Sequence, residues 1–446
     1  MEKIAQLNQL VGSHQYQLVQ QNLLAYNAVD IAAWMEELSP ISAVRIFRTL
    51  PKEVAAMVFT KLPPESQQDI IGAINDRELS TIIDDLFVDD AVDLLEELPA
   101  NVVKRVLTVA SPETRRLINQ FLQYPEDSAG SIMTAELIDL KAAMTVAEAF
   151  AHIRRTAIDS EMIYTCYVID ERRRLLGTVS VKDLLLAKYE TPVSQVMHTP
   201  ALCCTTTDPA IEATQMLSRY DLLCLPVVDR EHRLVGIITV DDAMDVMQQS
   251  ATEDLEKMSA LEPSDKPYLK TGVFTLARHR ILWLLVLMVS SMITGGILAK
   301  YEHAFAALPL LVTFIPMLTD TGGNAGSQSA TLIIRGMALS EIRGRDFFRV
   351  LWKELRVSLL VGVVLCLVNY VRLAIMYPGN TAMYMTVVLA LFATVVLAKC
   401  IGAVLPMIAK ALKIDPAIMA SPLITTIVDA VSLILYFFIA QHLLGI

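Results

Sequence analysis

One carboxylate of this chain lies where its charge is costly. Asp429 is near the middle of the run from residue 416 to 446, which is otherwise interrupted only by His442. An ionised carboxylate at the centre of a bilayer costs about 2.5–3.5 kcal/mol or more, so such a group faces a pore, a cation or a partner of opposite charge. Because no Lys or Arg lies in the interior of the apolar runs, we expect an ion or proton role for Asp429 rather than a structural ion pair.

A glycine-rich string precedes it, IPMLTDTGGNAGSQSATLIIRGMAL at residues 315 to 339. Gly322, Gly323, Asn324 and Gly326 stand at membrane depth or at its edge. An exposed backbone polar group is costly there unless a protein cavity or water satisfies it, which indicates a hydrated lumen or a close backbone approach. Tight helix packing through small residues is the alternative, and the string alone favours neither.

Carboxylates also crowd the string VDDAMDVMQQSATEDLEKM, residues 240 to 258. Hard divalent cations relieve such repulsion through oxygen ligands and bridging waters. A solvated acidic helix face is the alternative. The segment 249 to 262 has the pattern of an amphipathic helix and joins the front of the chain to its apolar part, which favours a regulatory cation site. The acidic residues are Asp241, Asp242, Asp245, Glu253, Asp254 and Glu256.

The charge of the chain is divided unevenly between its two parts. Residues 1 to 280 carry a net charge of −15 and residues 281 to 446 carry +4, within a total of −11. An acidic front part repels nucleic acid, so we expect no nucleic-acid partner and instead expect cations. No apolar stretch follows the first basic residue, so we expect no secretory signal and a cytoplasmic front part.

The spacing of charged residues after Arg280 predicts five membrane spans. Basic residues gather in the loops that would follow the second and fourth spans, including Arg343, Arg345, Lys399 and Lys410. Positive loops stay in the cytoplasm, so we expect a multi-pass protein of the inner cell membrane with a cytoplasmic N-terminus and an external C-terminus. The five runs are 281–299, 304–334, 357–371, 373–398 and 416–446.

Two repeats organise the cytoplasmic part. Apolar residues recur every twelve positions from Leu38 to Leu98, with prolines near several of them, which predicts a small α-superhelix over roughly 25 to 125. The segment 167–185 matches 226–244, and each copy has the pattern strand, turn, strand, helix. This tandem resembles a pair of CBS modules, which bind adenine nucleotides or ions and regulate an attached domain. A duplicated packing domain without a ligand is the alternative.

The chain resembles the MgtE family of magnesium channels and transporters over nearly its whole length, both in the order of its expected domains and in specific strings. The strings are YPEDSAGSIMT, SRYDLLCLPVVD, SATEDLEKM, TGGNAGSQSATLIIRG and DPAIMASPLITTIVDAVSLILYF. The resemblance implies a multidomain membrane protein with five parts. These are an N-terminal all-α superhelical domain (1–127), a tandem α/β CBS pair (128–192 and 193–248), a connecting plug helix (249–272) and a transmembrane domain of five helices (273–446).

The resemblance also implies a homodimer with a pore between its subunits, where Asp429 holds hydrated Mg²⁺ and Asn324 and its glycine neighbours line the passage. Mg²⁺ bound among cytoplasmic carboxylates would close the pore, and ATP is a further candidate ligand of the CBS pair. Ser250 and Ile211 stand where the family often has acidic residues, so fewer or weaker regulatory ions are expected. By motif match the regulatory residues are Asp90, Asp221, Asp242, Asp245, Glu253 and Asp254.

The expected function is therefore Mg²⁺ uptake through a channel or transporter that is gated shut by cytoplasmic Mg²⁺. A proton- or sodium-coupled divalent cation carrier, or a CBS-containing membrane sensor, are the alternatives. An enzyme is not expected, because no phosphate-binding glycine loop, no HExxH motif and no nucleophile–His grouping occurs.

Overall fold

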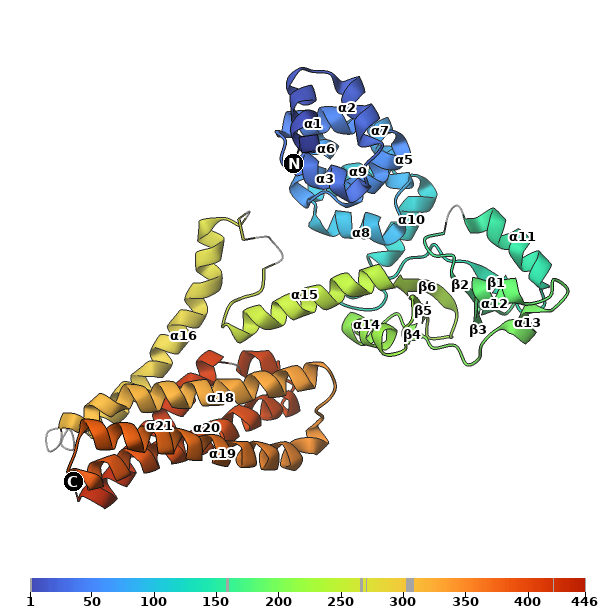
Figure 1. The fold of residues 1–446 in the computed structure, drawn as a ribbon. Helices are drawn as coiled ribbons and strands as arrows, with labels where there is room; N and C mark the ends of the chain where they lie inside the picture. The colour runs from blue at the N-terminus through green and yellow to red at the C-terminus, as the bar shows by residue number, and fades with distance from the viewer. Residues whose placement is uncertain are drawn as a thin grey trace. The chain divides into compact units, whose positions relative to one another are not determined.

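The computed structural model describes residues 2–157, 160–264, 268–269, 271–301, 309–419 and 421–445 (Figure 1). The chain forms two compact units, Met1–Gln248 and Gln249–Ile446. The first unit contains the superhelical and CBS parts, and the second contains the long apolar helices.

The first unit begins with ten short helices. Helices two positions apart pack together, so α3 contacts α5, α5 contacts α7 and α7 contacts α9, as expected of a superhelix. Asn27, Ser39, Asn75 and Ser111 cap helix starts with their side chains, which satisfies backbone N–H groups that a helix leaves unpaired. The all-α prediction is confirmed. The helices are α1 (Glu2–Gly12), α2 (Tyr16–Leu23), α3 (Ala28–Glu36), α4 (Pro40–Phe47), α5 (Lys52–Thr60), α6 (Pro64–Ala73), α7 (Asp76–Asp84), α8 (Val88–Glu97), α9 (Ala100–Val109) and α10 (Pro112–Phe121).

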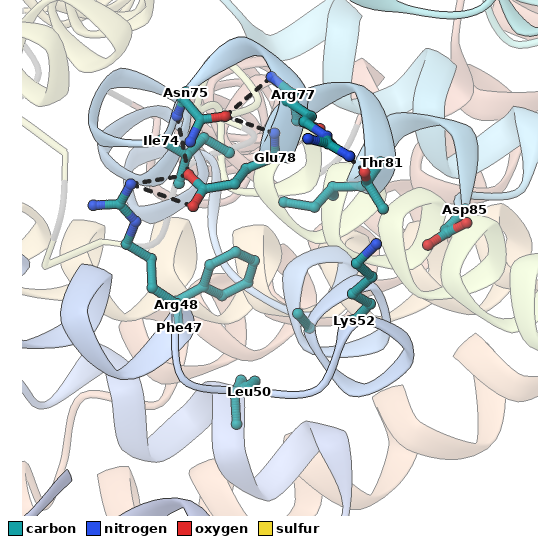
Figure 2. Close-up of a pocket in the computed structure, with 12 residues that line it drawn as sticks. Phe47, Arg48, Leu50, Lys52, Ile74, Asn75, Arg77, Glu78, Thr81 and Asp85 are labelled. Atoms are coloured by element: carbon teal, nitrogen blue, oxygen red, sulfur yellow. Dashed lines mark hydrogen bonds and ion pairs between the residues drawn. The ribbon is translucent and has the colours of Figure 1, made fainter. Parts of the chain in front are cut away.

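A cavity of about 470 Å³ lies beside the loops that precede α5 and α7 (Figure 2). Glu78 closes a capping box with Asn75 and also forms an ion pair of 3.0 Å with Arg48. Lys52 and Asp85 lie elsewhere in its lining. Charges of both signs therefore line this cavity. The contacts of Glu78 within it hold the start of α7 and link α7 to Arg48.

Two three-stranded sheets follow, and both have the same topology. In each sheet the first two strands are parallel and the last two antiparallel, with Val168 opposite Gly177 in one and Val227 opposite Gly236 in the other. A Cβ on either glycine would lie 2.7 Å from a backbone oxygen, which explains why both copies carry glycine there. The tandem α/β prediction is confirmed. The elements are β1 (Asp139–Lys141), α11 (Val146–Thr156), β2 (Thr165–Ile169), β3 (Leu175–Ser180), α12 (Val181–Leu186), α13 (Val193–Val196), β4 (Cys204–Thr205), α14 (Ala210–Arg219), β5 (Cys224–Val228) and β6 (Leu234–Thr239).

Helix α15 (Val240–Met258) contains the acidic string. The amphipathic helix expected over 249–262 therefore begins earlier, as the direct continuation of β6, and ends four residues sooner. Ser264 N donates to Glu256 Oε2 at 3.0 Å and folds the following segment back along the end of α15.

The described residues of the second unit include five long helices. Four of them are long and apolar enough to cross a membrane, namely α16, α19, α20 and α21. α18 has a comparable length but contains the polar glycine string, so the five-span count stays a prediction. α18 packs against both α20 and α21, α19 packs against α20, and the C-terminal end of α16 contacts α21 (Figure 1). The elements are α16 (Val273–Lys300), η2 (Pro309–Phe314), α18 (Ile315–Ala338), η3 (Gly344–Asp346), α19 (Phe347–Met376), α20 (Thr381–Ala411), η4 (Pro416–Met419) and α21 (Ser421–Leu444).

Two expectations about this unit were wrong. The boundary between the third and fourth apolar runs is not at Arg372, which lies inside α19, but at the turn 377–380. Lys399 is not a loop residue, because it lies within α20 and is 5% exposed. A basic side chain is therefore present in the interior of the helix bundle. Charge spacing missed both features because it treated every lysine and arginine as the end of a span.

Candidate functional site

Three carboxylates meet in the first unit. Asp89 from α8, Glu161 from the loop before β2 and Asp242 from the first turn of α15 each place an oxygen within 4.8 Å of the others. Asp89 is 8% exposed, and its Oδ1 has no hydrogen-bond partner among the described residues. The same holds for Glu161 Oε2. We call Asp89, Glu161 and Asp242 the carboxylate cluster.

Local structure fixes two members of the carboxylate cluster. Asp89 stands in the first turn of α8, after Phe87, and Asp242 accepts a hydrogen bond of 2.5 Å from Thr239 Oγ1. Asp183 is the equivalent of Asp242 in the first CBS module and accepts a bond of 2.6 Å from Ser180 Oγ. Asp183, however, also forms an ion pair of 3.1 Å with His198. The duplicated position thus has a basic partner in one copy and acidic neighbours in the other.

The carboxylate cluster is electrostatically unfavourable without a cation. Burial, followed by the charges of Glu161 and Asp242, raises the pKa of Asp89 to about 9. Burial and the charge of Asp242 raise the pKa of Glu161 to about 7, and burial raises the pKa of Asp242 to about 6. Removing water from like charges penalises the ionised forms, and a bound cation reverses that penalty. The orphaned oxygens and the all-oxygen donor set fit a hard divalent cation such as Mg²⁺.

The sequence did not identify all three members. It favoured Asp90 over its neighbour, and the structure places Asp89 in the carboxylate cluster instead. Asp90 lies nearby: burial raises its pKa, the charge of Lys61 opposes that change, and the charges of Asp241 and Glu136 add to it. Adjacent helical residues point about 100° apart, so sequence alone does not choose between them. Glu161 lies in a loop and belongs to no periodic pattern.

The other expected regulatory residues occupy different surroundings. Asp221 and Asp245 are exposed, and the charge of Asp245 acts on Asp242. In the second unit, Lys257 Nζ lies 3.1 Å from both Glu253 Oε2 and Asp415 Oδ2. Burial and then the charge of Asp415 raise the pKa of Asp254. The end of α15 therefore carries a second group of carboxylates, which already includes one ammonium.

Asp429 lies on α21 and has no ion-pair partner among the described residues. Its Oδ1 is buried without a hydrogen bond, and the charge that acts on it comes from another carboxylate, Asp320 of α18. The basic residue missed by the sequence analysis, Lys399, is bonded elsewhere, to Ser329. Asp429 is thus an uncompensated carboxylate in an apolar helix.

The glycine string faces the neighbouring helices. A Cβ on Gly322 would lie 2.7 Å from Thr394 Cγ2 of α20, and one on Gly323 would lie 2.9 Å from Thr425 Cγ2 of α21. Gly326 approaches the same two helices, whereas Asn324 is exposed on a different face of α18. The glycines thus provide close packing within one chain, and the exposed amide remains free to meet a ligand or a second copy.

Comparison with known proteins gives the same division of the chain. Family models match residues 26–127 as the MgtE intracellular N domain, 129–190 and 193–249 as CBS domains, and 315–439 as a divalent cation transporter. The magnesium transporter MgtE of Thermus thermophilus is 36% identical over 419 residues, which cover 93% of this chain and 92% of that protein. This chain belongs to the MgtE family.

Further relatives agree with membership of the MgtE family. The magnesium transporter MgtE of Bacillus subtilis is 32% identical and covers 92% of this chain and 93% of its own. A crystal structure of the cytosolic domain of the Mg²⁺ channel MgtE in complex with ATP is 34% identical, with a TM-score of 0.52, and covers 55% of this chain and 99% of that chain. The family resemblance is confirmed, and membership together with the apolar helices identifies a multi-pass membrane transport protein.

Proposed function

We propose that this protein is a Mg²⁺ channel of the cytoplasmic membrane that takes up Mg²⁺ and is closed by Mg²⁺ bound to its cytoplasmic unit. The observation that carries the proposal is the uncompensated carboxylate of Asp429 in an apolar helix. An ionised carboxylate in that environment is stabilised by a bound cation, and the relatives are magnesium transporters by name. Mg²⁺ keeps its waters readily, so Asp429 from each of two subunits is enough to hold a hydrated ion.

The carboxylate cluster supports the gating part of the proposal. At low Mg²⁺ its ionised members repel, and α8, the loop before β2 and α15 are pushed apart. At high Mg²⁺ a bound ion offsets the repulsion and favours the arrangement in which the three oxygens converge. A ligand shifts a conformational equilibrium by its differential affinity for the two states, and this site has such a difference. Asp90, Asp221, Asp245, Glu253 and Asp254 would supply further carboxylates to the gate.

The same proposal includes three features of the assembly. The protein is a homodimer, with Asn324 and Asp429 beside the passage, and its N-terminus is cytoplasmic while its C-terminus is external. ATP binds at the CBS pair, since a related cytosolic domain has been crystallised with ATP.

Mg²⁺ flux into liposomes that contain the purified protein tests the pore. We expect wild-type flux to fall roughly 100-fold in Asp429→Ala, because the ion loses its one fixed counter-charge at the bilayer centre. Glu341→Gln, at an exposed position after α18, is the matched control and should leave flux unchanged. Flux that is indifferent to Asp429 would overturn the proposal, and flux that requires a proton or sodium gradient would replace the channel with a coupled carrier.

A second arm steps the Mg²⁺ concentration on the cytoplasmic face. Wild-type flux should decrease as this concentration rises. The double variant Glu253→Gln/Asp254→Asn should stay open at concentrations that close the wild type. Unchanged inhibition in that variant would remove both residues from the gate.

A further inference from the structure

Helices α18, α19 and α20 share a buried polar relay. Ser329 Oγ donates a hydrogen bond of 2.7 Å to Glu354 Oε2, and Lys399 Nζ lies 3.4 Å from the same hydroxyl, to which it donates. Ser329, Glu354 and Lys399 are 0%, 8% and 5% exposed. Each comes from a different helix of the second unit, and we call these three residues the buried relay.

The buried relay is internally satisfied. The serine hydroxyl accepts from an ammonium and donates to a carboxylate, so it joins two opposite charges that do not touch directly. The bond to Glu354 is short, as strong charge-assisted bonds are, whereas the contact from Lys399 is longer at 3.4 Å. In a low-dielectric interior such a network tolerates little displacement. Because all three side chains are more than nine-tenths buried, they do not face a solvent-filled passage within this chain.

The relay stands beside a close contact between α18 and α20. Ser329 follows Gly326 by three residues on α18, and Gly402 follows Lys399 by three residues on α20, so each pair lies on one helix face. A Cβ on Gly402 would collide with the backbone oxygen of Gly326. Glycine allows this close approach but does not fix the sliding position of one helix along the other, whereas three directional groups do.

We infer that the buried relay fixes the register of α18 against α19 and α20 and thereby positions Asn324, which makes Ser329, Glu354 and Lys399 positioning residues for Mg²⁺ transport. Asn324 stands five residues before Ser329 on the same rigid helix. A shift of α18 therefore moves the amide by the same amount. This inference rests on the proposed function, because it assigns Asn324 to the ion path.

The test compares four variants with the wild type in liposomes. Ser329→Ala keeps both charges but breaks the relay, whereas Glu354→Gln and Lys399→Met each leave one charge alone. In the exchanged variant Glu354→Lys/Lys399→Glu the hydroxyl can reverse its roles and restore the chain of bonds. Lys410→Met, on the exposed end of α20, is the matched control, because Lys410 lies 3.5 Å from one backbone oxygen, that of Met337, and outside the relay.

We expect the Mg²⁺ concentration for half-maximal uptake to rise roughly tenfold in the three single relay variants, as a buried charge pair is broken or loses its bridge. The exchanged variant should recover to within about threefold of the wild type, because the coupling within a charge pair is pairwise. Three results would overturn the inference. They are an unchanged half-saturating concentration in the single variants, a loss confined to the maximal rate, and an exchanged variant no better than the single ones.

Hydrogen exchange of the α18 backbone in the same proteins needs no transport. Faster exchange in the single variants, reversed by the charge exchange, supports the inference even if the wild type carries no Mg²⁺, in which case the proposed function alone fails. Wild-type protection of α18 in all variants would overturn the inference while leaving the proposed function standing.

Discussion

Two sets of buried charged residues, one in each unit, are compensated in opposite ways. The carboxylate cluster collects three acidic groups with two orphaned oxygens, whereas the buried relay places Glu354 opposite Lys399 through a shared hydroxyl. A compensated pair needs nothing from outside, so removing one partner leaves a lone buried charge. A cluster of like charges needs a bound ligand to offset its repulsion, so removing one carboxylate from it relieves that repulsion. Burial of charge thus indicates a structural role in one case and a binding role in the other.

The comparison is tested most strongly by deleting one carboxylate from each set. Glu354→Gln should destabilise the protein by about 3–5 kcal/mol, because Lys399 loses its counter-charge. Asp89→Asn should be neutral or stabilising when Mg²⁺ is absent. Thermal unfolding of the full-length protein in mild detergent, with hydrogen exchange to locate each effect, measures both. Equal destabilisation by the two changes would remove the distinction.

Added Mg²⁺ should stabilise the folded protein through the carboxylate cluster and not through the buried relay. At 100 times its dissociation constant, an ion that binds only the folded state contributes about 2.7 kcal/mol. The wild type should gain this stability, and Asp89→Asn/Asp242→Asn should lose most of it. Asp183→Asn, at the equivalent position of the first CBS module, is the matched control and should keep it. A Mg²⁺-dependent rise in Tm that survives the double change would place the ion elsewhere.

The helix contact beside the buried relay can be tested without altering any charge. Gly402→Ala should destabilise by about 1–3 kcal/mol, because the new methyl collides with the backbone of Gly326. Gly295 and Gly296 of α16 have no atom within 4 Å of an added Cβ, so alanine there should be neutral or stabilising by up to about 1 kcal/mol. Unfolding midpoints in detergent report the difference. A Gly402→Ala protein with wild-type stability would show that α18 and α20 adjust freely.

A smaller effect is expected from pH. The raised pKa values of the carboxylate cluster mean that the folded state holds protons which the unfolded state releases, so stability present at low pH is lost as pH rises through about 6, 7 and 9. Without Mg²⁺ the Tm should fall between pH 6 and 9, by about 2–4 °C for each kcal/mol of stability lost. Saturating Mg²⁺ should flatten this profile, since it favours the ionised form. A Tm that rises over this range without Mg²⁺ would contradict the buried, acidic surroundings assigned to the carboxylate cluster.

The sequence predicted the repeated architecture well because a repeat is found by comparing one segment of the chain with another. The match between segments 167–185 and 226–244 correctly predicted two copies of a strand, turn, strand, helix unit, and Gly177 and Gly236 occupy equivalent positions in the two sheets. The same method could not distinguish Asp183 from Asp242, because their difference comes from His198 in one copy and from Asp89 and Glu161 in the other.

The membrane unit was predicted less well, for a related reason. Arg372 and Lys399 were treated as span ends, although one lies within α19 and the other is buried in α20. A lysine can lie inside a span when neighbouring helices compensate its charge, and the compensation of Lys399 by Glu354 and Ser329 depends on packing between helices that are distant in sequence. Asp429 was identifiable because its surrounding apolar run is long. Glu161 was not, because a single acidic residue in a loop has no local signature.

The composition of α18 has a consequence for how the protein is made. Among the described helices, α18 is not one of the four that are apolar enough to cross a membrane. The helix α20, against which α18 packs, carries a buried lysine in its interior. A lysine at the centre of a lone helix adds about 2.5–3.5 kcal/mol to the free energy of insertion by the translocon. The polar string of α18 and the lysine of α20 are therefore each an obstacle to insertion of a lone helix, although α20 is otherwise apolar enough to cross. Together with α19, the two helices satisfy each other's polar groups. Biogenesis should accordingly retain α18 beside the translocon until α19 and α20 emerge, and the three helices should enter the lipid as a group.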